Sequence, residues 1–243
     1  MSDELPTLKI TKADLNDRNE YIGATDVSDY AGHIEIDADL GWVKFTASIV
    51  AKGRIRSLAG SGIKAGSGVK AGWGIEAGYD IKAGSGIKAS SGIEAGYGIK
   101  AGSGIEAGSG IEAGSGIKAG WDIKAGSGIK AGYGIEAGSG VKAGYDIEAG
   151  SGIKAGWDIE AGSGIEAGYG IEAGYGIEAG SGIKAGLSIT AKWLSARLRI
   201  FAGTCAHRLP TPKDMEIRAE VRGGIVAFGT VVAPVGDAEN SDA

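Results

Sequence analysis

The chain has 243 residues, of which 47 are glycine, and its formal net charge is −5 at pH 7. This acidic balance argues against a surface dense enough in lysine and arginine to bind nucleic acid, and no run of about 18 apolar residues could cross a membrane. The single cysteine, Cys205, excludes an internal disulfide framework. The first residues lack the basic and apolar segments of a secretion signal, so we expect a cytoplasmic protein.

Residues 1–58 have an ordinary composition and precede a long repetitive region. Polar and apolar residues alternate in 33–37 and 43–49, which predicts two strands joined near Leu40 and Gly41 as a β-hairpin or as irregular first coils. We interpret 1–58 as an N-terminal β cap. A cap is needed because the uncovered end of a stack of strands exposes unpaired backbone groups.

Residues 59–190 consist of 22 consecutive hexapeptides, whose positions 1 to 6 are Ala, Gly, a variable residue, Gly or Asp, Ile, and Lys or Glu. Positions 1, 3 and 5 alternate with positions 2, 4 and 6, and this period of two predicts strands, whereas two glycines in every unit disfavour a helix. Position 5 is Ile except at Val69 and Val141, and a flexible linker would not keep such a column. The pattern predicts an all-β β-solenoid (β-helix) of about 22 strands, with position 5 inside, position 6 in water and a left-handed glycine at position 2.

The number of hexapeptides in one coil is less obvious. Between Ser91 and Tyr169, aromatic residues at position 3 fall in odd units and most serines in even units. If position 3 lies inside, two hexapeptides per coil would place a large residue opposite a small one and give a rod about 50 Å long. The charges favour the alternative, a triangular coil of three hexapeptides, in which Glu136, Lys154 and Glu172 stack with alternating sign. The interpretation that we carry forward is two per coil.

The aromatic residues at position 3 have two interpretations. Core packing follows if they share a side with isoleucine. If a corner turns them outward, they would form a continuous stripe suited to anchoring a protein partner. The charge balance is +2 from Lys64 to Lys130 and −5 from Tyr133 to Thr190, which could steer a basic partner to the acidic half or guide antiparallel self-association. The candidate binding residues are therefore Trp121, Tyr133, Tyr145, Trp157, Tyr169, Glu136, Glu148, Glu160, Glu172, Asp146 and Asp158.

Residues 191–235 follow the repeats and are interpreted as a C-terminal β cap. Residues 215–222 and 225–232 alternate on either side of Gly223 and Gly224, which predicts a β-hairpin. Residues 236–243 are acidic and are expected to be a disordered tail.

No motif predicts a cofactor, a metal or catalysis. The repeated Gly-x-Gly is followed by no helix that could hold a phosphate. The aspartates at position 4 are too few for a calcium-binding β-roll and are interpreted as solvated. Cys205 and His207 lie two residues apart, but a zinc site needs three or four ligands and a cysteine nucleophile needs a positioned base. We therefore expect a protein that is not an enzyme, and an enzyme with a site in this cap is the least favoured alternative.

The run Ala-Gly-Ser-Gly-Ile-Lys with its Trp and Tyr variants, followed by 198–205, resembles uncharacterised glycine-rich hexapeptide-repeat proteins of bacteria and their phages or prophages. The resemblance implies a β-solenoid without known catalytic residues, and an inhibitor of host defence, such as an anti-CRISPR protein. The expected function is therefore non-enzymatic binding of a host protein, a host complex or a second copy of the chain, by steric occupancy. An ice-binding or structural solenoid is the alternative, which the absence of threonine ladders disfavours.

Overall fold

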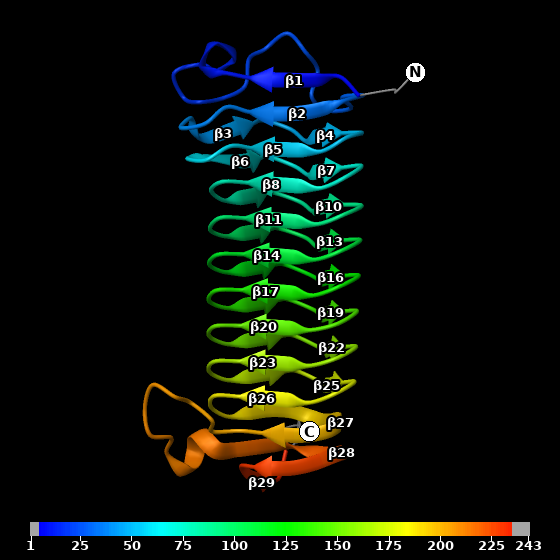
Figure 1. Cartoon of the computed structure of the whole chain (residues 1–243), viewed down its shortest axis with the longest axis vertical. Helices are drawn as coiled ribbons and strands as arrows, with labels where there is room; N and C mark the ends of the chain where they lie inside the picture. The colour runs from blue at the N-terminus through cyan, green and yellow to red at the C-terminus, as the bar shows by residue number, and fades with distance from the viewer. Residues whose placement is uncertain (1–4, 235–243) are drawn as a thin grey trace, which may run out of the picture.

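The computed structural model describes residues 5–234. This part of the chain is a parallel β-solenoid of about 11 turns (Figure 1). Its only helical elements are two short 3₁₀ helices, η1 (Lys12–Asp14) and η2 (Pro212–Met215). The prediction of an all-β solenoid is thereby confirmed, and the blue-to-red order of Figure 1 shows that successive turns follow the chain from one end of the rod to the other.

Each repeat strand pairs in parallel with the strands three before and three after it. Ile87, for example, lies beside Val69 and Ile105, so stacked residues are 18 positions apart. Three strands follow one another before the chain returns to the same column, which gives the rod three faces. We number these faces 1, 2 and 3 in the order in which the chain visits them in each turn.

The strands are short and have the following bounds. Face 1 contains β3 (Gly41–Phe45), β6 (Ser61–Ala65), β9 (Ile81–Ala83), β12 (Ile99–Ala101), β15 (Ile117–Ala119), β18 (Ile135–Ala137), β21 (Ile153–Ala155) and β24 (Ile171–Ala173). Face 2 contains β4 (Ile49–Ala51), β7 (Val69–Ala71), β10 (Ile87–Ala89), β13 (Ile105–Ala107), β16 (Ile123–Ala125), β19 (Val141–Ala143), β22 (Ile159–Ala161) and β25 (Gly176–Ala179). Face 3 contains β1 (Thr7–Ile10), β2 (His33–Ile36), β5 (Ile55–Ser57), β8 (Ile75–Ala77), β11 (Ile93–Ala95), β14 (Ile111–Ala113), β17 (Ile129–Ala131), β20 (Ile147–Ala149), β23 (Ile165–Ala167) and β26 (Ile183–Ala185).

Two hexapeptides per coil, the interpretation that we carried forward, is therefore wrong. The physical reason is that position 3 lies outside in every repeat after the first, where Ser61 is buried, so the alternation of aromatic residues and serine says nothing about interior volume. At three hexapeptides per coil the repeats form about seven coils, or about 35 Å at the spacing of paired strands, instead of about 50 Å.

The core is the same in every coil. The position-5 side chains, isoleucine or valine, are at most 1% exposed throughout the repeats, and the position-1 alanines from Ala65 to Ala185 are at most 7% exposed. Burial of a β-branched side chain contributes about 1.5–3 kcal/mol relative to leaving it in water. Position 5 is therefore the dry column that the sequence predicts.

The corners of the coil explain the glycine at position 2, but not as predicted. Within the repeats only Gly60 has a positive φ, of 72°. At the other corners a Cβ would collide with the previous coil: at Gly114 it would lie 2.1 Å from the carbonyl oxygen of Gly96. The prediction of a left-handed residue at each position 2 is thus wrong, and close approach of stacked backbones excludes a side chain.

The N-terminal segment continues the same parallel stack instead of forming a hairpin. β2 pairs with β1 and β5, and β3 pairs with β6, all in parallel. Ser61 ties this segment to the first repeat, because its hydroxyl accepts from the N–H of Leu40 at 2.8 Å and donates to the carbonyl of Asp37 at 2.6 Å. The strands near 33–37 and 43–49 are therefore irregular first coils, and their joining as a hairpin is wrong.

At the other end, two long strands wrap around the rod. β27 (Ile189–Phe201) crosses all three faces, and β28 (Glu216–Phe228) follows it in parallel, with Ile217 beside Ile189 and Val226 beside Ile200. β29 (Thr230–Val232) then pairs in parallel with the start of β28. The predicted hairpin at Gly223 and Gly224 is wrong because β28 runs through both glycines, and Gly224, at φ 90°, lies within it. The predicted tail 236–243 lies outside the described residues.

Candidate binding surfaces

All nine aromatic side chains at position 3 of the repeats lie at the surface. Their exposed fractions run from 36% at Tyr79 to 66% at Trp121 and Tyr133. Except in β6 and β25, which begin earlier, the repeat strands cover positions 5, 6 and 1, and positions 2 to 4 form the bend at which the alternation of inside and outside stops. Core packing of these aromatics is therefore wrong, and the alternative that a corner turns them outward is confirmed.

The exposed aromatics do not form the one continuous stripe that this alternative expects. An 18-residue register places Tyr133 and Tyr169 on the corner before face 1, Trp121 and Trp157 on the corner before face 2, and Tyr145 on the corner before face 3. Ring contacts within a corner column join Tyr79 to Tyr97 at 4.6 Å and Trp157 to Tyr175 at 6.2 Å between centroids. The five aromatic candidates are therefore distributed over three surfaces.

The aspartates at position 4 connect adjacent coils. Asp80, Asp122, Asp146 and Asp158 each accept a hydrogen bond of 2.7–2.9 Å from the backbone N–H of the glycine 18 residues later. The pKa of Asp122 is lowered from its ordinary value, first by the hydrogen bond from Gly140 and then by the side chain of Lys124. The interpretation of these residues as merely solvated is corrected, and the candidates Asp146 and Asp158 have a structural role.

The position-6 side chains form one charged column on each face. Five stacked pairs in the described repeats have opposite charge and N–O distances of 3.0 Å or less: Lys88–Glu106, Lys118–Glu136, Lys142–Glu160, Lys154–Glu172 and Lys184–Glu166. The alternation of Glu136, Lys154 and Glu172 expected for a three-hexapeptide coil is observed. Each such pair is exposed and stabilises the fold by about 0.5 kcal/mol or less.

The four glutamate candidates are also divided by the register. Glu136 and Glu172 lie on face 1, Glu160 on face 2 and Glu148 on face 3. Three of them already pair with a lysine, so the acidic half of the chain is not a single acidic surface.

Uninterrupted runs of one charge occur in the N-terminal half of the rod, which contains none of the charged candidate residues predicted from the sequence. Face 3 stacks Glu76, Glu94 and Glu112. Face 1 stacks Lys44, Lys64, Lys82, Lys100 and Lys118. A search for equal charges at a period of 18 would have found both columns.

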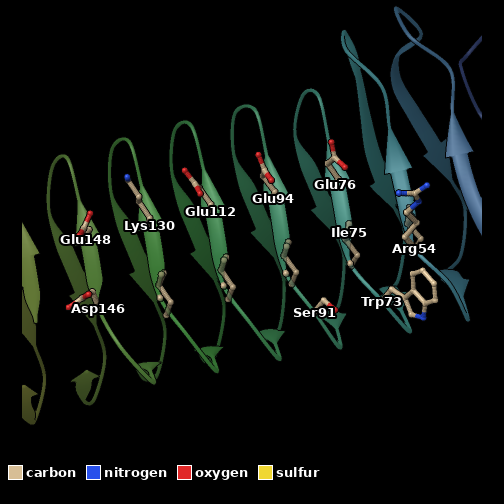
Figure 2. A pocket seen from close by; sticks show the side chains of 18 residues that line it. Arg54, Trp73, Ile75, Glu76, Ser91, Glu94, Glu112, Lys130, Asp146 and Glu148 are labelled. Atoms are coloured by element: carbon tan, nitrogen blue, oxygen red, sulfur yellow. The ribbon is translucent and has the colours of Figure 1, made fainter. Parts of the chain in front are cut away.

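Face 3 also carries a trough. Its floor is the position-4 column with Gly74, Gly92 and Gly110, and one wall is the glutamate column. Figure 2 shows Glu76, Glu94 and Glu112 in one row, one on each successive strand, with Trp73 at the corner near Arg54. Within residues 5–234, Glu94 and Glu112 make no ion pair, whereas Glu76 lies 3.3 Å from Arg56.

The indole of Trp73 lines this trough near its N-terminal end. The ring of His33 contacts it edge-on, with centroids 5.0 Å apart, and Nδ1 of His33 accepts a hydrogen bond of 2.9 Å from the N–H of Arg54. The contact with His33 packs one edge of the indole, and Trp73 remains a large, half-exposed side chain at the corner near Arg54.

The C-terminal Cys205 lines a shallow hollow with Phe201, Thr204 and Phe228, and His207 does not line it. In the described part of the chain, no group of three His, Cys, Asp or Glu side chains is arranged to hold a metal ion. No helix among residues 5–234 is long and apolar enough to span a membrane.

Comparison with known proteins adds no family: no protein-family model, no curated protein and no solved structure matches the chain.

Proposed function

We propose that this protein is a non-enzymatic, protein-binding rod that acts by steric occupancy, and that the trough of face 3 is its main contact surface. The observation that carries the proposal is the unbroken column of Glu76, Glu94 and Glu112 beside a glycine floor. Flat backbone at the floor lets a partner approach closely, and a row of carboxylates attracts a basic surface.

The aromatic residue at the end of the trough supplies an anchor. Trp73 is 54% exposed, and tryptophan is among the residues that contribute most when a protein partner buries them. The partner that fits this combination is a protein with a row of lysine or arginine side chains and a pocket for an indole. The exposed corners that border face 3, at Tyr145 on one side and at Tyr133 and Tyr169 on the other, extend the contact area, whereas Trp121 and Trp157 lie on the corner between faces 1 and 2.

The resemblance to repeat proteins of bacteria and phages is the basis for proposing which class of partner the rod binds. The partner is a cytoplasmic host protein or complex, and occupancy of its basic surface inhibits host defence in an anti-CRISPR-like manner. Defence effectors that bind nucleic acid carry basic surfaces for that purpose, and an acidic rod suits such a surface.

The alternative of an ice-binding solenoid is less well supported, because each face carries a column of charged side chains in place of a flat hydroxyl ladder. Thermal hysteresis of an ice suspension would reveal that activity.

The test compares two charge-reversal variants in direct binding. Proteins that co-purify with the rod from a bacterial lysate are identified by mass spectrometry, repurified and titrated against the wild type, Glu94→Lys/Glu112→Lys and the matched face 1 variant Lys82→Glu/Lys100→Glu. We expect the face 3 variant to bind about 100-fold more weakly, at about tenfold for each reversed charge, and the face 1 variant to bind normally. Equal affinity of both variants for every captured protein would rule out face 3 as the contact surface.

A further inference from the structure

Face 2 carries a charged column that is complementary to itself when it is reversed. From the N-terminal to the C-terminal end, this column reads Lys70, Lys88, Glu106, Lys124, Lys142, Glu160 and Glu178. We infer that a second copy of the chain packs on face 2 in antiparallel orientation, with a twofold axis that passes beside Lys124. This dimer does not depend on the function proposed above, since it leaves face 3 open.

A twofold axis that runs across the rod places each column against the same column of the other copy, in reverse order. Lys70 then faces Glu178 of the second copy, Lys88 faces Glu160, and Glu106 faces Lys142. By symmetry, six of the seven charged positions meet an opposite charge. The coils beyond both ends of the column present Val50 and Ser195, which are uncharged, so the whole charged column is used.

The ion pairs within each chain strengthen this match. Lys88 pairs with Glu106 at 2.8 Å, and Lys142 pairs with Glu160. In the dimer, the first pair lies against the second pair of the other copy with the charges reversed. Each such group forms a closed ring of four alternating charges, and two rings lie symmetrically about the axis.

The one position where like charges meet is neutralised locally. At the axis Lys124 faces its own copy, but its Nζ lies 3.0 Å from Oδ2 of Asp122 in the same chain. The axis therefore brings together two ion pairs instead of two bare ammonium groups.

The corner column of face 2 has a complementary distribution of size. Its N-terminal half holds Ser67, Ser85 and Ser103, and its C-terminal half holds Ser139, Trp157 and Tyr175, of which the two rings are 62% and 43% exposed. In the antiparallel arrangement the two large rings face serines beside the glycine-floored trough of the other copy. Trp121, 66% exposed, faces its own copy at the axis, where two indoles can stack.

The other two faces lack this property. In an antiparallel dimer through face 1, the charged column from Lys44 to Glu172 would face the same column of the second copy. Opposite charges would then meet at four of the eight positions. The column of face 3 from Lys9 to Lys184 does so at four of ten positions. Self-association through charge complementarity therefore selects face 2.

The test is a charge swap followed by sedimentation velocity at micromolar protein and low salt. We expect the wild type to be a dimer, and Lys88→Glu and Glu160→Lys to be monomers, because each substitution turns two attractive pairs into repulsive ones and weakens the dimer by about 100-fold or more. An equimolar mixture of these two variants restores both pairs, so it is expected to form a heterodimer. The double variant with both substitutions in one chain is expected to be a dimer.

The matched control is Lys118→Glu on face 1, where Lys118 pairs with Glu136 at 2.7 Å and is similarly exposed. This variant should remain a dimer, and circular dichroism of every variant reports whether the solenoid is intact. A monomeric wild type, dimeric Lys88→Glu, or a mixture of the two single variants that stays monomeric would overturn the inference.

Discussion

The corner glycines give the sharpest test of how the coils stack. A Cβ at Gly114 would lie 2.1 Å from the carbonyl oxygen of Gly96, whereas a Cβ at Gly110 would lie 3.4 Å from that of Gly128, an ordinary contact. Both glycines flank β14, so Gly114→Ala and Gly110→Ala change the same chemical group within the same coil. Only the first one should separate neighbouring coils.

The magnitude follows from the bonds at that corner. To relieve the contact in Gly114→Ala, the coils must move apart at this corner, which weakens the hydrogen bonds from Gly114 N–H to Ala95 O (3.1 Å) and from Ser115 N–H to Tyr97 O (2.8 Å). At up to about 1 kcal/mol for each of the two bonds, the free energy of unfolding should fall by about 1–2 kcal/mol. Gly110→Ala should change it by less than about 1 kcal/mol and can stabilise, because alanine restricts the unfolded chain.

Urea unfolding followed by circular dichroism measures both values. Ser90 already shows the expected strain, since it is the one repeat residue other than glycine at position 2 and its N–H lies 3.4 Å from the carbonyl oxygen of Ala71. Equal unfolding midpoints for Gly114→Ala and Gly110→Ala would refute the explanation by close approach.

Two further predictions concern the core and the aspartates. Ile147→Asp places a charge in the dry column, where Ile147 is 0% exposed, and should lower the free energy of unfolding by roughly 4 kcal/mol. The control Glu148→Asp changes an outward side chain and should leave the free energy of unfolding almost unchanged. Cooperative unfolding of both variants at the same midpoint would contradict burial of position 5. Asp122→Asn should destabilise the protein at pH 7 by about 0.5 kcal/mol, since the carboxylate accepts from Gly140 and pairs with Lys124. Because the pKa of Asp122 is lower in the folded protein, its contribution is complete above the unfolded pKa and is lost as the pH falls through the folded pKa, so the difference between wild type and variant should vanish in acid. A difference that is constant with pH would show that the charge of Asp122 does not contribute.

The sequence predicts the core because the core is periodic. The alternation within each hexapeptide identifies position 5 as buried, and the structure agrees at every coil from Ile63 to Ile189. Period-two reasoning fails at the corner, because positions 2 to 4 bend and no longer alternate between inside and outside. Position 3 therefore lies outside instead of inside, which removes the argument for a coil of 12 residues, and the observed coil has 18 residues.

The candidate surface was harder to predict for the same reason. Glu148 and Glu160 are neighbours at a period of 12 but lie on different faces at a period of 18. Once the register is known, the sequence identifies the glutamate column of face 3 and the lysine column of face 1 without further information. The parallel course of β28 through Gly223 and Gly224 could not be read from the sequence, because the alternation of a hairpin and that of a wrapping strand are the same.

The order of charges at position 6 is better explained by binding than by stability of the fold. Every coil has the same isoleucine and alanine core, so the fold tolerates either charge at position 6. Alternation on all faces would add weak ion pairs, whereas stacked like charges repel by about 1 kcal/mol or less at the spacing of paired strands in water. Face 1 nevertheless keeps five lysines in succession, face 3 keeps three glutamates, and face 2 has an order that only its own reversal complements. The folded monomer gains at most a few weak ion pairs from these three patterns. The partners proposed above, which would neutralise each column, would account for them.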